Sequence, residues 1–279
     1  MEWASGNGLR VSGANGRWSK IDKPPYLPAS PFLTKSQGKT NPLQNTFVAM
    51  KTNTLNFARL TGIALLAMAI LAGFAFVFAM NEVFVPADMN ATYLNVLANT
   101  GLYQAMTWAF TVIFLLDILV SFSLCYWLSD HNPKMVKSMA VLRLLYSLIL
   151  AVGIFHLFQS YYPEAADPYD SILRFQHYFS LGLIVFGVHL SLLGWILWKR
   201  MDIPKLFGAL ALFAGLCYTL IHFLIMSWPE FASYRQTIEN GLALPMAAGE
   251  LALALWLSIK GKRFSPMLSG SAHPAFYAT

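Results

Sequence analysis

Four ionisable side chains stand inside long apolar stretches of this 279-residue chain: Asp117, Arg143, His189 and Glu250. An ionisable group within an apolar span is costly in free energy, and such groups are usually paired or functional. Each lies 7 to 11 residues from the end of its stretch that is assigned below to the inner side of a membrane. At 1.5 Å per helical residue the four depths agree within roughly 6 Å. The sequence therefore predicts polar groups from four helices at one level.

Two kinds of chemistry fit this candidate intramembrane cluster. In the first, Asp117 or Glu250 neutralises Arg143 in a salt bridge that only holds helices together. In the second, the cluster lines a water-accessible cavity that binds an anion, a proton or a polar metabolite. The second carboxylate favours the second interpretation, because one arginine leaves one carboxylate unpaired or protonated, as in proton-handling sites.

Three further histidines lie towards the opposite ends of their apolar stretches: His156, His177 and His222. Neutral imidazoles at a similar depth could ligate a metal or a haem iron. However, His177 and His189 are 12 residues apart on one predicted helix, which separates them by about 120° around its axis. Paired haem ligation in one helical core is therefore not indicated, and ordinary interfacial histidines are the competing interpretation. No metal site and no particular cofactor is predicted.

Recognisable catalytic and nucleotide-binding motifs are missing from the chain. The glycines near the N-terminus follow no strand and precede no helix, and there is no GxSxG or HExxH segment. Cys125 and Cys217 both stand in apolar runs and form no CxxC motif. The sequence gives no positive evidence for an enzyme.

The elements that must position these residues are apolar helices. Hydrophobic residues make up 57% of the chain and charged residues 11%, whereas soluble domains carry about 25% charged residues. Six stretches are long enough to cross about 30 Å of hydrocarbon, and lipid requires each to be helical. They span residues 60–80, 102–128, 136–160, 174–198, 205–228 and 241–259. The predicted fold class is all-α, an integral membrane bundle of six transmembrane helices.

Charges between these stretches alternate in sign, and cationic loops face the cytoplasm in membrane proteins. Ten lysines and arginines flank what we assign as the inner ends: Lys51, Arg59, Lys134, Lys137, Lys199, Arg200, Lys205, Lys260, Lys262 and Arg263. The other three loops hold only Arg174 and Arg235 as cations, beside Glu82, Asp88, Glu164, Asp167, Asp170, Glu230 and Glu239. The N and C termini are predicted to be cytoplasmic. The net charge of +6 thus reflects membrane orientation, and nucleic acid is not a predicted partner.

Both ends of the chain differ from its apolar middle. Residues 1–49 are rich in Gly, Ser, Asn, Pro and Lys and show no helical or strand period, so they are predicted to be a disordered basic tail. We expect the natural start at Met50, with an extension before it; a tail drawn to anionic lipid is the alternative. Residues 50–261 form the transmembrane domain, and residues 262–279 a short cytoplasmic tail.

Small residues recur at helical spacing in two of the stretches. Residues 205–228 contain Gly208, Gly215, Thr219 and His222, and residues 174–198 contain Gly187, Ser191 and Gly194. Such stripes allow membrane helices to approach closely. In the long first outside loop, residues 93–98 are predicted to form a short interfacial helix.

Several short segments resemble a known family. They are ARLTG at residues 58–62, HLSLLG at 189–194, IPKLFG at 203–208 and GELALALWL at 249–257, together with Asp117, Arg143 and Pro245. In this order the segments resemble the uncharacterised bacterial multi-pass membrane family called domain of unknown function 4386, over about residues 57–261. The resemblance implies an integral protein of a bacterial plasma (inner) membrane. It implies no reaction, ligand or catalytic residue.

Three hypotheses of function follow. The first is a multi-pass membrane protein that binds or moves a small polar solute or protons through Asp117, Arg143, His189 and Glu250. There Arg143 holds an anionic group, the carboxylates exchange protons, and His189 relays or hydrogen-bonds. The second is a non-transporting sensor or assembly module with a structural salt bridge. The third is a haem- or quinone-linked electron carrier built on the outer histidines. The lipid bilayer is the predicted partner, with a small molecule or a proton as ligand and a homo-oligomer as an open alternative.

Overall fold

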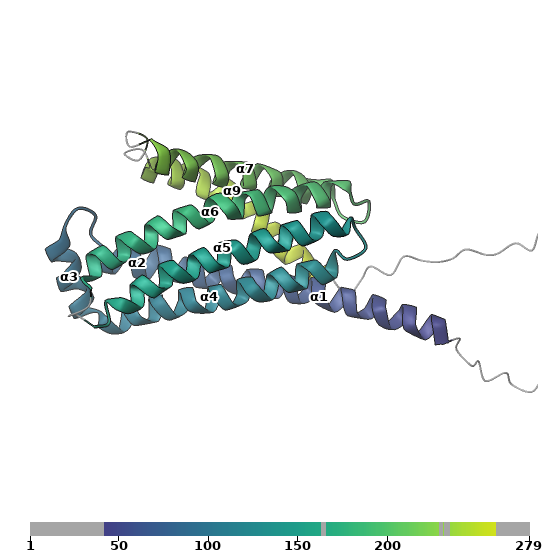
Figure 1. Ribbon diagram of the computed structural model, residues 1–279, viewed down its shortest axis with the longest axis horizontal. Coiled ribbons are helices and arrows are strands. Elements are labelled where there is room, and N and C mark those ends of the chain that lie inside the picture. Colours follow the sequence, from purple (N-terminus) through teal and green to yellow (C-terminus); the bar gives the residue numbers. More distant parts are fainter. Residues whose placement is uncertain (1–41, 163–165, 229–230, 232–234, 261–279) are drawn as a thin grey trace, which may run out of the picture. The chain divides into compact units, whose positions relative to one another are not determined.

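The computed structural model describes residues 42–162, 166–228, 231 and 235–260 (Figure 1). Residues 46–279 form one unit of the chain, separate from residues 1–45. The tail predicted for residues 262–279 and most of the tail predicted for residues 1–49 lie outside the described residues. The main helices are α1 Pro42–Ala72, α4 Thr100–Trp127, α5 Pro133–Gln159, α6 Pro168–Lys199, α7 Lys205–Ser227 and α9 Arg235–Lys260.

Five of the described segments are long and apolar enough to cross a membrane. They are Asn56–Val83, Thr100–Trp127, Pro133–Gln159, Pro168–Lys199 and Lys205–Ser227. The described chain contains helices and no strand. These findings confirm the all-α class, and the five long apolar helices overlap the first five predicted spans. The sixth predicted span corresponds to α9, whose apolar part Met246–Ile259 is shorter in the described residues, so the count of six stays a prediction.

The first span changes helix type before it ends. A π-helix, η1 (Gly73–Ala79), follows α1 and continues into the short α2 (Met80–Val83). Helix α1 begins at Pro42, before the span, so residues 42–49 of the predicted tail are helical. Proline is well tolerated in the first turn of a helix, where its missing N–H is not needed.

Asparagine or aspartate followed by proline starts two of the spans. The Asn132 side chain accepts a hydrogen bond from the Lys134 N–H, and Pro133 is the first residue of α5. Asp167 accepts from the Tyr169 N–H at 2.7 Å, and Pro168 opens α6. A capping side chain satisfies one of the helix's unpaired N–H groups, and proline fixes the first helical φ angle. Hydropathy predicted these spans from residues 136 and 174, so the capped prolines start α5 and α6 three and six residues earlier than predicted.

The first outside loop contains the short helix α3, Met89–Ala98, which includes the predicted residues 93–98. Asp88 caps it by accepting a hydrogen bond from the Ala91 N–H at 2.8 Å. Inside the turn, Thr92 exchanges hydrogen bonds with the backbone of Val85. The loop is therefore folded onto itself, and α3 packs against the start of α6.

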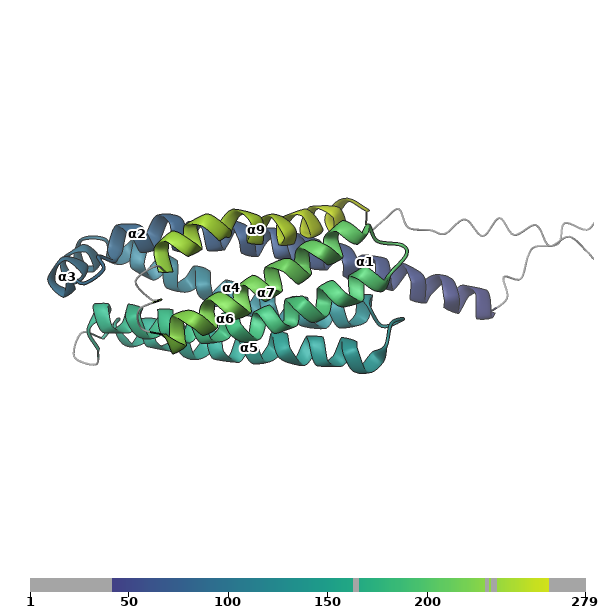
Figure 2. The same cartoon turned by 90° about the horizontal axis from the view of Figure 1, so that it is seen from above.

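Helices that follow one another in the chain pack side by side, from α4 through α5 and α6 to α7 and α9 (Figure 2). Helix α1 contacts both ends of this series. The Thr61 and Ser123 hydroxyl oxygens are 2.6 Å apart between α1 and α4, and a Cβ on Gly62 would lie 2.6 Å from the Ser258 nitrogen on α9. The six long helices thus form a closed ring of neighbours, which gives the bundle an interior.

Helices α6 and α7 approach most closely along the two predicted small-residue stripes. A Cβ placed on Gly215 would lie 2.5 Å from the Gly187 carbonyl oxygen, and one on Gly194 would lie 2.8 Å from that of Gly208. Thr219 on α7 donates a hydrogen bond to the Ile184 carbonyl of α6. The stripes therefore face each other, which confirms that they are helix contacts. This contact sets the distance between α6, which carries His189, and α7.

The turn between α6 and α7 is fastened by charges. Arg200 donates two hydrogen bonds to the Asp202 carboxylate, at 2.8 and 2.7 Å. These bonds hold the pKa of the Asp202 carboxyl below its ordinary value, so this carboxylate is ionised at neutral pH. The Arg200 guanidinium also lies over the Trp127 ring, 5.7 Å from its centroid, which ties the turn to the end of α4.

Candidate functional site

The centre of the bundle holds an ion pair between α4 and α5. Arg143 Nη2 donates to Asp117 Oδ1 at 2.6 Å, and the two side chains are 2% and 0% exposed. The helix spacing of α5 brings Arg143 inward together with Ser147, whose hydroxyl donates to the Arg143 carbonyl. On α4, Ser121 lies one turn from Asp117 and donates to the Ala140 carbonyl. Asp117 and Arg143 are thus brought together at the α4–α5 contact.

His189 of α6 adds a third helix to this ion pair. Its Nε2 lies 3.2 Å from Arg143 Nη1, and its Nδ1 lies 2.8 Å from the Met139 carbonyl oxygen. A carbonyl can only accept, so Nδ1 carries the proton, and Nε2 then accepts from the guanidinium, which can only donate. His189 is therefore held as the neutral Nδ1–H tautomer. This geometry fits a hydrogen-bonding role rather than a proton relay.

The guanidinium of Arg143 also lies over an aromatic ring. The Arg143 carbon Cζ lies 5.4 Å from the centroid of the Phe186 ring. Phe186 also stacks on His189, with centroids 5.7 Å apart, and contacts Tyr146 at 4.9 Å. A guanidinium over an aromatic face gains electrostatic attraction, and the gain is larger where water is absent.

Two polar atoms of the ion pair have no hydrogen-bond partner in the described structure. They are Asp117 Oδ2 and Arg143 Nε. A buried polar atom without a partner costs about 1–3 kcal/mol, and more for a charged group. The ion pair therefore has unused hydrogen-bonding capacity on both of its side chains.

Glu250 of α9 lies beside the ion pair without binding it directly. Its carboxyl group hydrogen-bonds with the Tyr218 side chain of α7. It interacts electrostatically with both Arg143 and Asp117, and its side chain is half-buried. The four residues predicted from sequence therefore gather in one region, with Glu250 held by a partner of its own.

Tyr218 and Tyr146 are members of the cluster that sequence reasoning missed. Tyr146 is 6% exposed and interacts electrostatically with Asp117, Arg143 and Glu250. Tyr146 follows Arg143 by three residues, so the two share a face of α5. That spacing was the available signal for Tyr146. No comparable signal marked Tyr218, because its role depends on which face of α7 meets α9.

The outer histidines are distributed over different surroundings. His156 Nδ1 lies 2.8 Å from Gln159 Oε1, and its ring stacks on Tyr178. His177 is exposed and contacts the edge of the same Tyr178 ring. His222 is buried and stacks on Tyr218, with centroids 6.3 Å apart. His222 therefore lies next to Tyr218, the hydrogen-bond partner of Glu250. Among the described residues, no group of three or more His, Cys, Asp or Glu side chains could hold a metal ion.

Comparisons with known proteins identify a family whose model covers most of the chain. The model of a family described as "Domain of unknown function (DUF4386)" matches residues 60–261. The chain is 28% identical over 158 residues to an uncharacterised protein of Archaeoglobus fulgidus, covering 57% of this chain and 85% of the relative. No solved structure matches the chain.

Proposed function

The chain belongs to the DUF4386 family, and we propose that it is a multi-pass membrane protein that exchanges a proton at Glu250 and couples this exchange to a small polar solute. Family membership supplies no reaction, so the proposal rests on the cluster itself. The observation that carries it is the charge balance. Arg143 is the one cation of the cluster, Asp117 and Glu250 are two carboxylates, and the hydrogen bonds of His189 keep it neutral.

A surplus negative charge inside a membrane is strongly disfavoured. The cluster reaches neutrality when one proton joins the two carboxylates, and it carries one negative charge when that proton leaves. The Tyr218 hydroxyl can donate to an ionised Glu250 carboxylate, or accept from a protonated one. This pair therefore accommodates both protonation states without moving a helix.

The contacts divide the cluster into two parts with different roles. Asp117, Arg143 and His189 join α4, α5 and α6 through buried short hydrogen bonds, and we assign them a structural role. Glu250 and Tyr218 join α9 to α7, and Glu250 is half-buried. We assign proton exchange to this second part. In the structural part, the unpaired atoms Asp117 Oδ2 and Arg143 Nε are the points where a polar solute or water binds.

The proposal includes six spans with cytoplasmic termini in a bacterial plasma membrane. Helix α9 has 26 residues, which corresponds to roughly 39 Å along its axis and exceeds the hydrocarbon thickness. The alternation of cationic and acidic loops supports the orientation. Under this topology the cluster lies in the inner half of the bilayer.

Infrared spectroscopy of the purified protein tests the exchange at Glu250. We expect a pH-difference spectrum with the C=O stretch of one protonated carboxylic acid, and uptake of one proton per protein measured with an indicator dye. Glu250→Gln removes both signals because the remaining pair, Asp117 and Arg143, is already neutral. Glutamine can still accept from Tyr218, so the helix contact is kept.

Glu82→Gln is the matched control, because Glu82 is an exposed carboxylate on α2. The Glu82→Gln variant should keep the C=O stretch of the intramembrane carboxylic acid and the uptake of one proton per protein. If Glu250→Gln also keeps both, the proposed exchange is wrong and the cluster is a structural salt bridge.

The charge balance predicts the same loss from the other carboxylate. In Asp117→Asn, Glu250 becomes the only counter-charge of Arg143, so it should stay ionised and the protonated-carboxyl signal should disappear although Glu250 is present. The same pH-difference spectrum measures this. An unchanged signal in Asp117→Asn would mean that the protonation of Glu250 is independent of Arg143.

A further inference from the structure

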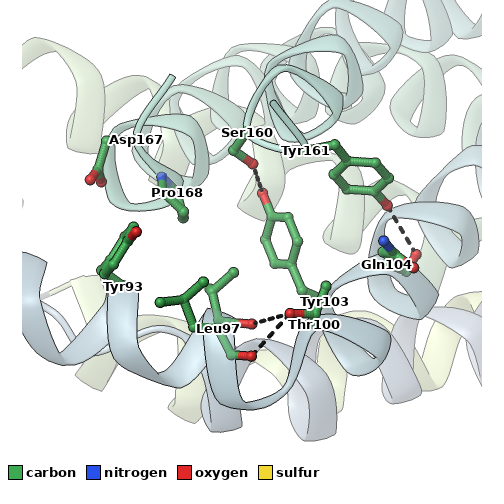
Figure 3. Close-up of a pocket in the computed structure, with 10 residues that line it drawn as sticks. Tyr93, Leu97, Thr100, Tyr103, Gln104, Ser160, Tyr161, Asp167 and Pro168 are labelled. Carbon is green, nitrogen blue, oxygen red and sulfur yellow. Dashed lines mark hydrogen bonds between the residues drawn. The ribbon is translucent and has the colours of Figure 1, made fainter. Parts of the chain in front are cut away.

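A second polar site lies far along the helices from the charged cluster, where the ends of four helices meet. It is a pocket of about 210 Å³ between α3, the start of α4, the end of α5 and the start of α6 (Figure 3). Its walls are formed by Tyr93, Val96, Leu97, Thr100, Tyr103, Gln104, Ser160, Tyr161, Asp167 and Pro168. By the proposed topology it opens on the outer side of the membrane.

Three tyrosines make much of the wall. Tyr103 forms part of the floor, since it is 1% exposed and its hydroxyl oxygen lies 2.7 Å from the Ser160 hydroxyl oxygen. Tyr161 donates to the Gln104 carbonyl at 3.4 Å, and Tyr93 is 38% exposed at the rim. Figure 3 shows Tyr93 on one side of the space and Tyr103 and Tyr161 on the other. Rings from α3, from α4 and from the turn that follows α5 therefore line the cavity.

Among the described residues that line the pocket, one carries a formal charge, and it is negative. Asp167 is the only charged side chain among the ten lining residues. Its Oδ1 caps α6 by accepting from the Tyr169 N–H. Burial raises the pKa of Tyr161, so this phenol stays neutral at physiological pH and keeps its electron-rich ring face.

An anion finds little to bind in this pocket. Pro168, the first residue of α6, has no N–H, and the next N–H already donates to Asp167. At the end of α3, the Val96 and Leu97 carbonyls accept the Thr100 hydroxyl. The ends of α3 and α5 bring carbonyl groups where α4 and α6 bring N–H groups, so the helix dipoles largely cancel. The negative charge of the Asp167 carboxylate therefore favours a positively charged ligand.

We propose that this pocket binds a small alkylammonium cation. Asp167 supplies the counter-charge, and the tyrosine rings contact the methyl or methylene groups around the nitrogen. Aromatic walls with a nearby carboxylate attract ammonium groups through the negative faces of the rings. The volume lies below the range of about 300–1,000 Å³ that is typical for drug-sized ligands, so the site suits a headgroup-sized cation. The acidic outer loops would raise the local concentration of cations.

Titration calorimetry of the full chain in detergent, with choline as the probe, tests the proposal. We expect saturable one-site binding that weakens at least tenfold in Asp167→Asn. Asparagine is as good a helix cap as aspartate, so this variant keeps the fold of α6 while it loses the charge. Asp88→Asn is the matched control, because Asp88 caps α3 in the same way but does not line the pocket. It should bind choline within about twofold of the wild type.

A second probe separates charge from shape. The neutral analogue of choline, in which carbon replaces nitrogen, should bind at least tenfold more weakly than choline. Equal binding of the two probes, or equal binding of choline by Asp167→Asn and the wild type, would overturn the proposal.

The ammonium group could reach the pocket as a free amine or as part of a lipid headgroup. Saturable binding of free choline in detergent indicates the first source. Binding that appears only in nanodiscs of phosphatidylcholine, and not of phosphatidylglycerol, and that is lost in Asp167→Asn, indicates the second. The absence of binding in both formats contradicts the assignment. None of these readouts depends on Glu250, so the test is independent of the proposed proton exchange.

Discussion

Replacing Asp117 with leucine is expected to lower the free energy of unfolding by about 3–5 kcal/mol, the cost of stranding a buried charge. Arg143 is 2% exposed, and within the described structure its one hydrogen bond to a carboxylate is the short bond to Asp117. Without Asp117, the guanidinium keeps only the neutral His189 nitrogen and the Phe186 ring beside it. Glu250 then stays ionised, but among the described side chains it hydrogen-bonds with Tyr218 and not with Arg143, so it replaces the lost ion pair only in part.

Unfolding in mixed micelles of a mild detergent and dodecyl sulfate, followed by tryptophan fluorescence, measures this loss. The double variant Asp117→Leu with Arg143→Leu removes both charges together and should recover most of the stability, because a buried ion pair can often be replaced by apolar residues. A remaining deficit of about 1 kcal/mol is expected from the hydrogen bond that His189 loses. The exposed Asp130 provides the control, since Asp130→Leu should change stability by less than about 0.5 kcal/mol.

If Asp117→Leu is no less stable than the wild type, Arg143 is not held by Asp117. The assignment of these residues to a structural role would then be wrong. A double variant as unstable as the single one would attribute the loss to altered packing around position 117 rather than to the unpaired charge.

The second large effect is expected from a single methyl group at Gly215. Its Cβ would lie 2.5 Å from the Gly187 carbonyl oxygen and 2.6 Å from the Ser191 backbone nitrogen. These are backbone atoms, so Gly215→Ala can be accommodated only if α6 and α7 move apart. We expect a loss of about 3 kcal/mol, at the upper end of the usual range for overpacking, measured by the same unfolding assay.

Gly101→Ala is the matched control for this substitution. Gly101 lies in the first turn of α4, and a Cβ there meets no atom within 4 Å. Alanine has the higher helix propensity, so this variant should be as stable as the wild type or more stable by up to about 1 kcal/mol. Equal stability of the two alanine variants would contradict the close contact of α6 with α7.

The separation of α6 and α7 also bears on the proposed proton site. His189 belongs to α6 and Tyr218 to α7, so moving the two helices apart changes the position of Tyr218 relative to Arg143 as well as to Glu250. The glycine contact between α6 and α7 therefore helps to bring Glu250 close enough to interact electrostatically with Arg143 and Asp117.

The sequence alone determined the all-helical class, the approximate positions of five long apolar helices and the contact stripes. Hydropathy identifies spans because lipid offers no hydrogen bonds to the backbone, so an apolar run of sufficient length must be helical. Hydropathy missed the first turns of α5 and α6, which Asn132-Pro133 and Asp167-Pro168 start through capping and a fixed φ angle. The small residues of α6 and α7 could likewise be read from helical spacing, and the structure confirms that they meet.

Tertiary structure decided which polar groups touch. Depth along a helix follows from residue number, so Asp117, Arg143, His189 and Glu250 could be placed at one level. Contact also requires the rotation of each helix about its axis and its choice of neighbour, which depend on packing over the whole bundle. For this reason the sequence did not show that Asp117 forms an ion pair with Arg143 or that Glu250 hydrogen-bonds with Tyr218. It also did not show that His222 lies beside Tyr218. The pocket at Asp167 depends on the same factor, because four helix ends from distant parts of the chain must meet to enclose it.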